Sequence, residues 1–294
     1  MTAHPPISYL KAILDSTRPR QWGKNLLVLA APLAAGVLNE RRVQVEAAGA
    51  FAAFTLIAAA VYLNNDVIDA DSDRKHPRKR LRPVAAGRLS TRAALVSAVI
   101  LAATGLALGW FIDQDLAVTL AAYLVIQILY SAWLKHQAVL DLAIVSAGFL
   151  LRAIAGGVAV DVPLSQWFLL VAAFGSLFMV AGKRYSELQD LGNAAGTRRT
   201  LESYSESYLR FVWSLAAAVT ITAYSLWAFE NSRGSEINWH AISIAPFVMG
   251  LLRYAIDIDR GLAGEPEEAV LRDHVLQVIV VIWIVTFAIG AYQS

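Results

Sequence analysis

The sequence has 294 residues, contains no cysteine and is poor in charged residues. The missing cysteines exclude disulfides and cysteine-ligated zinc or iron–sulfur sites. Charged residues make up 16% of the chain, whereas a soluble domain usually carries about 25%. The five histidines are scattered and show no metal-ligand spacing. Together with 57% hydrophobic residues and a positive mean hydropathy, these deficits indicate a protein surrounded by lipid.

The motifs of three common enzyme classes are absent as well. The sequence contains no G-x-x-x-x-G-K-[ST], no G-x-S-x-G and no H-E-x-x-H. It therefore gives no support to a P-loop ATPase, a serine hydrolase or a zinc protease.

Nine stretches are long and apolar enough to cross a membrane, because a bilayer core about 30 Å thick needs roughly 20 mostly apolar residues per helix. They cover residues 24–39, 43–64, 92–112, 115–134, 138–160, 164–182, 208–229, 238–256 and 273–292. Several are rich in alanine and glycine, which lets membrane helices approach closely. We predict an all-α membrane protein, a bundle of nine transmembrane helices with cytoplasmic catalytic loops, forming one domain over residues 1–294. Ser90 should cap the third helix, and Ser203 with Glu206 should form a capping box before the seventh.

Lysine and arginine are distributed unevenly between the two ends of these helices. Nearly all of them lie at the N-terminus or after the second, fourth, sixth and eighth helices, and the opposite side holds only Arg41, Arg42 and Arg233. Positively charged loops stay in the cytoplasm. We therefore predict a multi-pass protein of the cell membrane whose N-terminus and even-numbered loops are cytoplasmic. Nine spans then place the C-terminus outside.

The strongest chemical signal is NDVIDADSD, which begins at Asn65 where the second helix meets the cytoplasmic side. Asp66, Asp69 and Asp73 have the spacing i, i+3, i+7 and share one face of a helix, whereas Asp71 points elsewhere. Acidic groups at membrane depth are costly and normally mark function. Clustered carboxylates repel each other unless a cation lies among them, and Mg²⁺ typically binds one or two carboxylates plus phosphate oxygens. The alternative is a solvated acidic helix end that only sets topology.

Basic residues follow this acidic motif directly, in the run RKHPRKRLRP that begins at Arg74. One explanation is positive-inside topology with attraction to anionic lipid. The other is that some of these bases bind phosphate groups. A metal–diphosphate site needs both kinds of residue, because acids hold the ions and bases neutralise the remaining phosphate charge. Lys79 and Arg82 are our phosphate-binding candidates in this run.

A second acidic pair follows the sixth predicted helix, within KRYSELQD. Glu187 and Asp190 are three residues apart and lie just past the helix end, flanked by bases. Alone the pair is a weak signal, but it is stronger as the partner of the first motif. We expect it to face the first motif across a cytoplasmic cavity and to complete a two-metal arrangement. Lys183, Arg184 and Tyr185 are candidates for binding substrate.

Four further candidates lie elsewhere. Tyr130 and Lys135 frame the short loop after the fourth helix, and Lys24 enters the first helix, where snorkelling of the side chain is the main alternative. Arg152 lies inside the fifth helix, and a lone intramembrane arginine should face the bundle interior and a negative partner. A salt bridge to a structural acid and attraction of a lipid phosphate both stay open for Arg152. The small residues Gly156 and Gly157 nearby could leave room for an apolar tail.

These features resemble the UbiA-type intramembrane prenyltransferase superfamily. Its motif N-D-x-x-D-x-x-x-D after the second helix is matched by Asn65 and the three aligned aspartates. A second motif, often D-x-x-D-x-x-x-D, follows the sixth helix. Here Glu187 and Asp190 match its first two positions, and Ala194 occupies the third. The resemblance implies Mg²⁺ as the cofactor, held by these five acids, with the three aspartates and Glu187 in catalytic roles and Asn65 binding substrate.

A narrower resemblance is to the actinobacterial branch that transfers a phosphoribosyl group to decaprenyl phosphate. It rests on the stretches RPRQWGKN (18–25), SDRKHPRKRLRPVAAG (72–87), LKHQAVLD (134–141), LRAIAGG (151–157), KRYSEL (183–188) and LESYS (201–205). Most superfamily members ionise a prenyl diphosphate and attach the prenyl group to an acceptor. In this branch phosphoribosyl diphosphate is the metal-bound donor and a polyprenyl phosphate is the acceptor, for the arabinan precursor of the cell wall. The resemblance thus implies an Mg²⁺-dependent pentosyltransferase, a glycosyltransferase.

The alternatives come from two other classes of function and from within the family. An ordinary family member would prenylate an aromatic acceptor. A transporter would use the acids as ion sites, but the sequence shows no inverted repeat. A purely structural membrane protein would not need two acidic clusters. We expect no nucleic-acid partner, and a homo-oligomer stays open.

Overall fold

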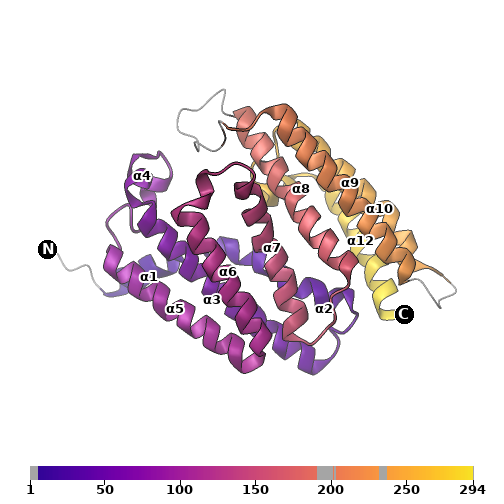
Figure 1. Cartoon of the computed structure of the whole chain (residues 1–294), viewed down its shortest axis with the longest axis horizontal. Coiled ribbons are helices and arrows are strands. Elements are labelled where there is room, and N and C mark those ends of the chain that lie inside the picture. The colour runs from indigo at the N-terminus through magenta and orange to yellow at the C-terminus, as the bar shows by residue number, and fades with distance from the viewer. Residues whose placement is uncertain (1–5, 191–200, 202, 232–236, 294) are drawn as a thin grey trace. The chain divides into compact units, whose positions relative to one another are not determined.

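The structure, a computed structural model, describes residues 6–190, 201, 203–231 and 237–293, apart from the side chains of residues 6–8, 190, 267 and 293. Every regular element in these ranges is a helix (Figure 1), so the all-α prediction is confirmed. In chain order the elements are α1 (Pro6–Ser16), η1 (Pro19–Leu29), α2 (Ala30–Ala34), α3 (Arg41–Ile68), α4 (Ala70–Lys75), η2 (Lys79–Leu81), α5 (Thr91–Ile112), α6 (Gln114–Ala132), η3 (Leu134–His136), α7 (Leu140–Ala159), α8 (Gln166–Asp190), α9 (Glu206–Glu230), α10 (Trp239–Asp259), α11 (Pro266–Arg272) and α12 (His274–Gln293).

The chain separates into two compact units. Unit 1 comprises Met1–Ala30, Arg41–Lys135 and Leu151–Asp161. Unit 2 comprises Ala31–Glu40, His136–Leu150 and Val162–Ser294. The prediction that residues 1–294 form a single transmembrane domain stays a prediction.

Eight helices in the described part of the chain are long and apolar enough to cross a membrane. They are α3, α5, α6, α7, α8, α9, α10 and α12. These helices match the second to ninth predicted stretches, so a multi-span membrane protein is confirmed. The count of nine is not confirmed, because the first stretch folds differently.

That first stretch, 24–39, contains most of the 3₁₀ helix η1 and the short helix α2 rather than one long α-helix. Pro32 lies within α2 and has no N–H to donate to an α-helical ladder. Gly36 follows with φ +70°, and a Cβ there would lie 2.1 Å from the carbonyl oxygen of Ala291. Only glycine fits this conformation and this close contact, so a continuous α-helix cannot run through the stretch.

The two predicted helix caps had different outcomes. Ser90 caps α5 as predicted, and its Oγ accepts a hydrogen bond from the N–H of Ala93 at 3.3 Å. The capping box at Ser203 is wrong, because α9 begins only at Glu206. Ser205 is its cap, and its Oγ accepts from the N–H of Tyr208 at 3.1 Å. The sequence offers several serines before α9, and their spacing alone favoured the wrong one.

In unit 1, α3 packs against α5 and α6, and small residues bring the backbones close together (Figure 1). A Cβ at Gly105 of α5 would lie 2.9 Å from the side chain of Ile57 and 3.1 Å from the carbonyl oxygen of Ala53. A Cβ at Gly156 of α7 would lie only 1.7 Å from the carbonyl oxygen of Val28 in η1. The prediction of open space beside Gly156 is therefore wrong, because the η1 backbone fills it.

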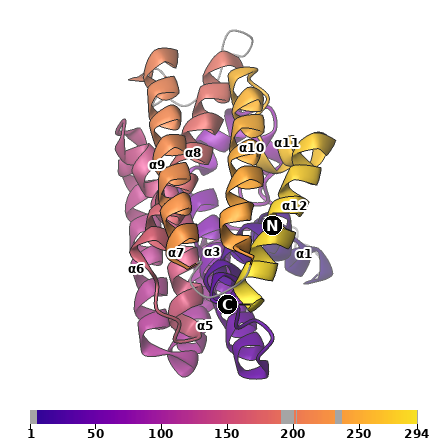
Figure 2. The ribbon, with the colours of Figure 1, turned by 90° about the vertical axis from the view of Figure 1, so that its right-hand side faces the viewer.

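In unit 2, α8, α9, α10 and α12 lie side by side (Figure 2). Their core is rich in aromatic rings that meet edge to face, such as Phe178 with Tyr254 at 5.8 Å and Tyr185 with Trp213 at 6.5 Å between centroids. Tyr185 is fully buried in this core. Aromatic pairs of this kind add packing energy beyond the area that they bury, so the C-terminal part of α8 is held firmly within unit 2.

Candidate active site

The first acidic motif lies in unit 1, where α3 ends and α4 begins. Helical hydrogen bonds continue across this junction, because Asp69 N–H donates to the Asn65 carbonyl and Asp73 N–H donates to the Asp69 carbonyl, both at 2.8 Å. The i, i+3, i+7 spacing therefore survives in space. Asp66 and Asp73 are buried, whereas the Asp71 side chain is 93% exposed, as its divergent position predicted.

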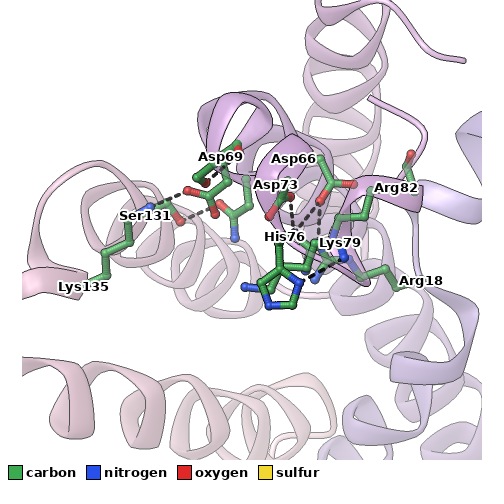
Figure 3. Close-up of polar contacts among 12 residues, drawn as sticks. Arg18, Asp66, Asp69, Asp73, His76, Lys79, Arg82, Ser131 and Lys135 are labelled. Atoms are coloured by element: carbon green, nitrogen blue, oxygen red, sulfur yellow. Dashed lines mark hydrogen bonds and ion pairs between the residues drawn. The ribbon is translucent and has the colours of Figure 1, made fainter. Parts of the chain in front are cut away.

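Two arginines meet the buried pair of aspartates. Arg82 Nη1 lies 2.6 Å from Asp73 Oδ2 and 3.5 Å from Asp66 Oδ1, so one guanidinium nitrogen bridges two carboxylates (Figure 3). Arg18 Nη2 lies 2.5 Å from the same Asp66 Oδ1. The Arg18 guanidinium also lies over the ring of Tyr62, 4.8 Å from its centroid. The predicted base Arg82 is thus at the motif, together with Arg18.

The remaining two motif residues contact the end of α6 and η3. Lys135 Nζ lies 2.6 Å from Asp69 Oδ1. Ser131 Oγ donates a hydrogen bond to Asn65 Oδ1 at 2.5 Å. In Figure 3, Asp69, Ser131 and Lys135 lie apart from the two buried aspartates and their arginines. The motif therefore has two sides, one facing arginines and one facing Lys135.

Within the described residues, no three acidic or histidine side chains come together in a way that could hold a metal ion by themselves. A cage built from all three aspartates is therefore not present. Asp66 and Asp73, however, already share one cationic nitrogen of Arg82. Two carboxylates around one cation fit Mg²⁺, which commonly binds one or two carboxylates and completes its shell with phosphate oxygens and water. The pair fits a metal that arrives with a phosphate ligand.

Arg152 is buried in unit 1, where two neutral side chains accept hydrogen bonds from its guanidinium. Its Nε donates to Asn25 Oδ1 at 2.8 Å, and its Nη2 donates to the Tyr123 hydroxyl at 3.1 Å. The guanidinium also lies over the rings of Phe54 and Tyr123, at 4.9 and 5.0 Å from their centroids. Asn25 in turn donates to Thr55 Oγ1 at 3.0 Å. These contacts tie η1 to α3, α6 and α7 and favour a structural role over phosphate binding.

Three other candidates are half-buried in unit 1: Lys24 in η1, Lys79 at the start of η2 and Tyr130 in the last turn of α6. The N–H of Lys79 donates to His76 Nδ1 at 3.3 Å. This bond fixes the turn between α4 and η2, which carries the chain from Asp73 to Arg82. Local folding therefore returns the basic run to the acidic motif that precedes it.

In unit 2, Glu187 lies near the end of α8 beside a buried arginine. Arg184 Nη1 donates to Glu187 Oε2 at 2.8 Å. The same guanidinium binds both oxygens of Asp141, at 2.8 and 3.1 Å. Asp141 and Arg184 are both buried. Arg184 therefore fixes the carboxylate of Glu187, and Asp141 fixes Arg184.

The other candidates of unit 2 lie around this arrangement. Lys183 Nζ is 3.8 Å from Glu187 Oε1 and 3.8 Å from Glu265 Oε2. The hydroxyl of the core residue Tyr185 accepts a hydrogen bond from Arg210 at 2.6 Å. Asp190 lies in α8, but its side chain is outside the described residues, as are Ala194 and position 202 of the 201–205 stretch.

Three residues at these motifs were missed by the sequence interpretation. Arg18 was not chosen as a site residue, and Asp141 and Ser131 were not considered individually. Arg18 and Asp141 do lie within the 18–25 and 134–141 stretches. An acid in the first turn of a mostly apolar helix, as Asp141 is in α7, was a usable signal. No local pattern marks Ser131.

Comparison with known proteins gives matches over most of the chain. The sequence profile described as the UbiA prenyltransferase family matches residues 26–271. Decaprenyl-phosphate phosphoribosyltransferase from Mycolicibacterium smegmatis is 50% identical over 307 residues, covering 100% of this chain and 96% of the relative. The protein of the same name from Corynebacterium glutamicum is 46% identical over 296 residues, covering 98% and 89%.

Solved structures show the same fold. A UbiA homolog from Archaeoglobus fulgidus, solved with GPP and Mg²⁺, superposes with a TM-score of 0.73 over 96% of this chain and 100% of that chain. The two sequences are 17% identical. At this identity the similarity shows a shared fold and nothing about activity.

Proposed function

Because the chain belongs to the UbiA prenyltransferase family, we propose that it transfers the 5-phosphoribosyl group of phosphoribosyl diphosphate to a polyprenyl phosphate such as decaprenyl phosphate. The observation that carries this proposal is the 50% identity, over the whole chain, to a decaprenyl-phosphate phosphoribosyltransferase. The pairing of buried acids with arginines in unit 1 supports it, because a diphosphate donor needs both metal-binding carboxylates and phosphate-binding bases.

The proposed reaction breaks one bond and forms one bond at the ribose. The bond from C1 to the diphosphate oxygen breaks, and the electron pair leaves with the diphosphate. C1 develops oxocarbenium character, and an oxygen of the lipid phosphate forms the new bond to C1. This nucleophile is already anionic, so no general base is required. Catalysis then consists of positioning and of stabilising the leaving group.

The residues of unit 1 would bind and orient the donor. Asp66 and Asp73 would hold Mg²⁺ together with diphosphate oxygens. When bound there, Mg²⁺ neutralises the charge of the leaving diphosphate. Arg82 and Lys135, now paired with carboxylates, would turn to phosphate oxygens as the donor enters. Lys24, Lys79, Tyr130 and Asn65 remain candidates for the donor's 5-phosphate and hydroxyl groups.

The acids of unit 2 are proposed to serve a second metal position. Glu187 is the best-defined candidate, because Arg184 fixes its carboxylate and Lys183 lies nearby. Asp190 is its proposed partner, on the i, i+3 spacing alone. Arg184 itself binds both Asp141 and Glu187, so we propose that it positions Glu187. Measuring Mn²⁺ stoichiometry with diphosphate in wild type and in Glu187→Gln tests this proposal, and an unchanged stoichiometry would reject it.

The second candidate function is prenyl transfer to an aromatic acceptor, which the family membership favours. Purified protein would be incubated with Mg²⁺ and either labelled phosphoribosyl diphosphate plus decaprenyl phosphate or a prenyl diphosphate plus an aromatic acid. We expect labelled lipid from the first pair only, and none after chelation of Mg²⁺. Product from the second pair alone would overturn the proposal.

We also propose that the N-terminus and the even-numbered predicted loops are cytoplasmic, that residues 24–39 cross the membrane in addition to the eight long helices, and that the C-terminus is therefore outside. The lack of cysteine makes this testable without removing any native thiol. In whole cells a membrane-impermeant maleimide should label Arg41→Cys and spare Arg80→Cys, both of which replace exposed arginines. In inside-out vesicles the maleimide should label Arg80→Cys and leave Arg41→Cys unlabelled. Labelling of Arg80→Cys in whole cells would reverse the assigned orientation.

A further inference from the structure

Arg18 has a backbone conformation that is unusual for a residue with a side chain. It joins α1 to η1 with φ 55° and ψ 66°, in the left-handed region. This region costs free energy for any residue other than glycine. The cost is greater before Pro19, because a proline biases the residue ahead of it towards extended conformations. Such strain persists only where surrounding contacts hold it, and it gathers at functional sites.

The backbone N–H of Arg18 donates to the Asp15 carbonyl at 3.2 Å, and the side-chain contacts of Arg18 are those of its guanidinium. It lies over the Tyr62 ring and donates to Asp66 Oδ1, and Tyr62 and Asp66 are one helical turn apart on α3. Asp66 is almost fully buried, with a side chain 1% exposed, whereas Arg18 keeps 27% of its side chain exposed. The left-handed turn thus directs a partly solvated guanidinium to a buried carboxylate.

The carboxylate oxygen that Arg18 binds is also within reach of Arg82. Both arginines approach Asp66 Oδ1, at 2.5 and 3.5 Å. A metal ion that uses this oxygen must compete with Arg18 for it. A diphosphate brings the oxygens that a displaced guanidinium prefers, since arginine binds phosphate with a matching fork of donors. Metal without diphosphate gives Arg18 no new partner.

We propose that Arg18 is a donor-binding residue that exchanges Asp66 for a phosphate oxygen when the metal and the diphosphate bind together. Arg18 thereby couples the two ligands: it weakens metal binding alone and strengthens metal binding in the presence of diphosphate. This inference rests on the proposed diphosphate site, but it does not depend on which group the enzyme transfers.

The test measures Mn²⁺ binding to the full-length protein by electron paramagnetic resonance, with and without inorganic diphosphate. Without diphosphate, Arg18→Ala should bind Mn²⁺ about threefold to tenfold more tightly than wild type, because a competitor for Asp66 is gone. With Mn²⁺ present, the affinity for diphosphate should fall by about tenfold or more. The matched control is Arg20→Ala, which removes an exposed arginine two residues away and should change neither value.

Two further variants separate the side chain from the backbone. Arg18→Gly also lacks the guanidinium but adopts the left-handed conformation without strain, so it should bind both ligands as Arg18→Ala does and melt at a higher temperature. Arg18→Lys keeps the positive charge but loses the paired N–H donors of the guanidinium. Its diphosphate affinity should lie between those of wild type and Arg18→Ala.

Tighter Mn²⁺ binding together with weaker diphosphate binding in Arg18→Ala supports the exchange. If Arg18→Ala, Arg18→Gly and Arg20→Ala all bind Mn²⁺ and diphosphate as wild type does, Arg18 has only a structural role and the proposal is wrong. Loss of both affinities together would also overturn it. If Arg18→Ala gives these two binding changes but the wild-type protein does not transfer the phosphoribosyl group, the proposed reaction is wrong and the role of Arg18 still holds.

Discussion

Arg18 and Lys135, beside the acidic motif of unit 1, meet more solvent than Arg184, beside the acidic motif of unit 2. In unit 1 the side chains of Arg18 and Lys135 are 27% and 24% exposed. In unit 2 the side chain of Arg184 is 6% exposed and engages both oxygens of Asp141, which is 1% exposed. A partly solvated base can exchange one anion for another at low cost, whereas a buried bidentate pair cannot be opened cheaply. We infer that the bases of unit 1 act on ligands and that Arg184 acts on the protein.

The largest effect should come from the carboxylate at the centre of unit 1. Asp66→Asn keeps the size of the side chain but removes the charge that meets two arginines and that we propose to bind Mg²⁺. We expect turnover to fall by about 100-fold to 1000-fold, as when one preorganised electrostatic contact is removed from an active site. Initial rates with labelled donor at saturating lipid would measure the loss.

The same motif contains the matched control for this change. Asp71→Asn alters an aspartate five residues on, whose side chain is 93% exposed and pairs only with Arg74 among the described contacts. It should turn over within about twofold of wild type, since exposed ion pairs contribute little. Near-normal activity of Asp66→Asn at limiting Mg²⁺ would remove the motif from the proposed mechanism.

The next effect concerns stability rather than chemistry. Arg184→Ala leaves the buried carboxylate of Asp141 without its partner, which typically costs about 3–5 kcal/mol. We expect a large drop in the unfolding temperature of the purified protein. The double variant Asp141→Asn, Arg184→Met removes both charges, so it should recover part of the loss.

Arg272→Ala is the control for this change in unit 2, because its ion pair with Glu268 is solvent-exposed. It should cost less than about 1 kcal/mol. If Arg184→Ala is no less stable than Arg272→Ala, the buried pair does not hold unit 2 together. The contrast between the two units then fails.

The counterpart in unit 1 is the removal of Lys135. Its partner Asp69 has a side chain 33% exposed, so the carboxylate left behind can be hydrated. Lys135→Ala should therefore shift the unfolding temperature by no more than about 2 °C, while the KM for the donor rises about tenfold through a lost charge-assisted contact. The KM for the lipid should stay unchanged. An equal rise in both Michaelis constants would show that Lys135 does not belong to the donor site.

The sequence predicted what depends on local periodicity. The spacing separated the exposed Asp71 from Asp66 and Asp73, which meet the same arginine, because helical hydrogen bonds continue through the α3–α4 junction. Asp69 does not join that pair and contacts Lys135 instead. Long apolar stretches likewise identified all eight helices that qualify as spans in the described part of the chain. Both signals lie within a few turns of one helix, where geometry follows directly from residue spacing.

Pairings between distant residues could not be predicted in this way. Arg18 meets Asp66 across 48 positions, and Arg184 meets Asp141 across 43. Nothing local distinguishes these bases from others that only set topology. The space beside Gly156 was mispredicted for the same reason, because the η1 backbone that fills it is distant in sequence. The 3₁₀ form of η1 also depends on such contacts, because long 3₁₀ helices are uncommon without them.

A second ion pair in unit 2 provides the intermediate case between buried and exposed pairs. Asp273 joins α11 to α12, and its Oδ2 lies 2.5 Å from Arg253 Nε of α10. Its Oδ1 accepts hydrogen bonds from the N–H groups of Val275 and Leu276 at 2.9 and 3.1 Å, which caps α12. The hydrogen bond from Arg253 is the main cause of a pKa of Asp273 below its ordinary value, and the bonds from the α12 backbone add to it.

The smallest effect should come from Asp273→Asn, which keeps an N-cap acceptor for α12 but loses the charge. Since the folded-state pKa lies below the unfolded value of about 3.9, the carboxylate stabilises the fold above that value and ceases to do so as pH falls through the folded-state pKa. At pH 7 the variant should unfold about 2 °C or less below wild type. The two curves should converge as the pH is lowered below about 4, and Asp273→Ala should stay lower throughout because it also lacks the cap. Thermal unfolding in detergent between pH 3 and pH 8 measures all three proteins. A constant difference in unfolding temperature between wild type and Asp273→Asn over this range would show that the ion pair with Arg253 contributes nothing. Among the ion pairs compared in unit 2, only the buried Arg184–Asp141 pair would then stabilise the unit.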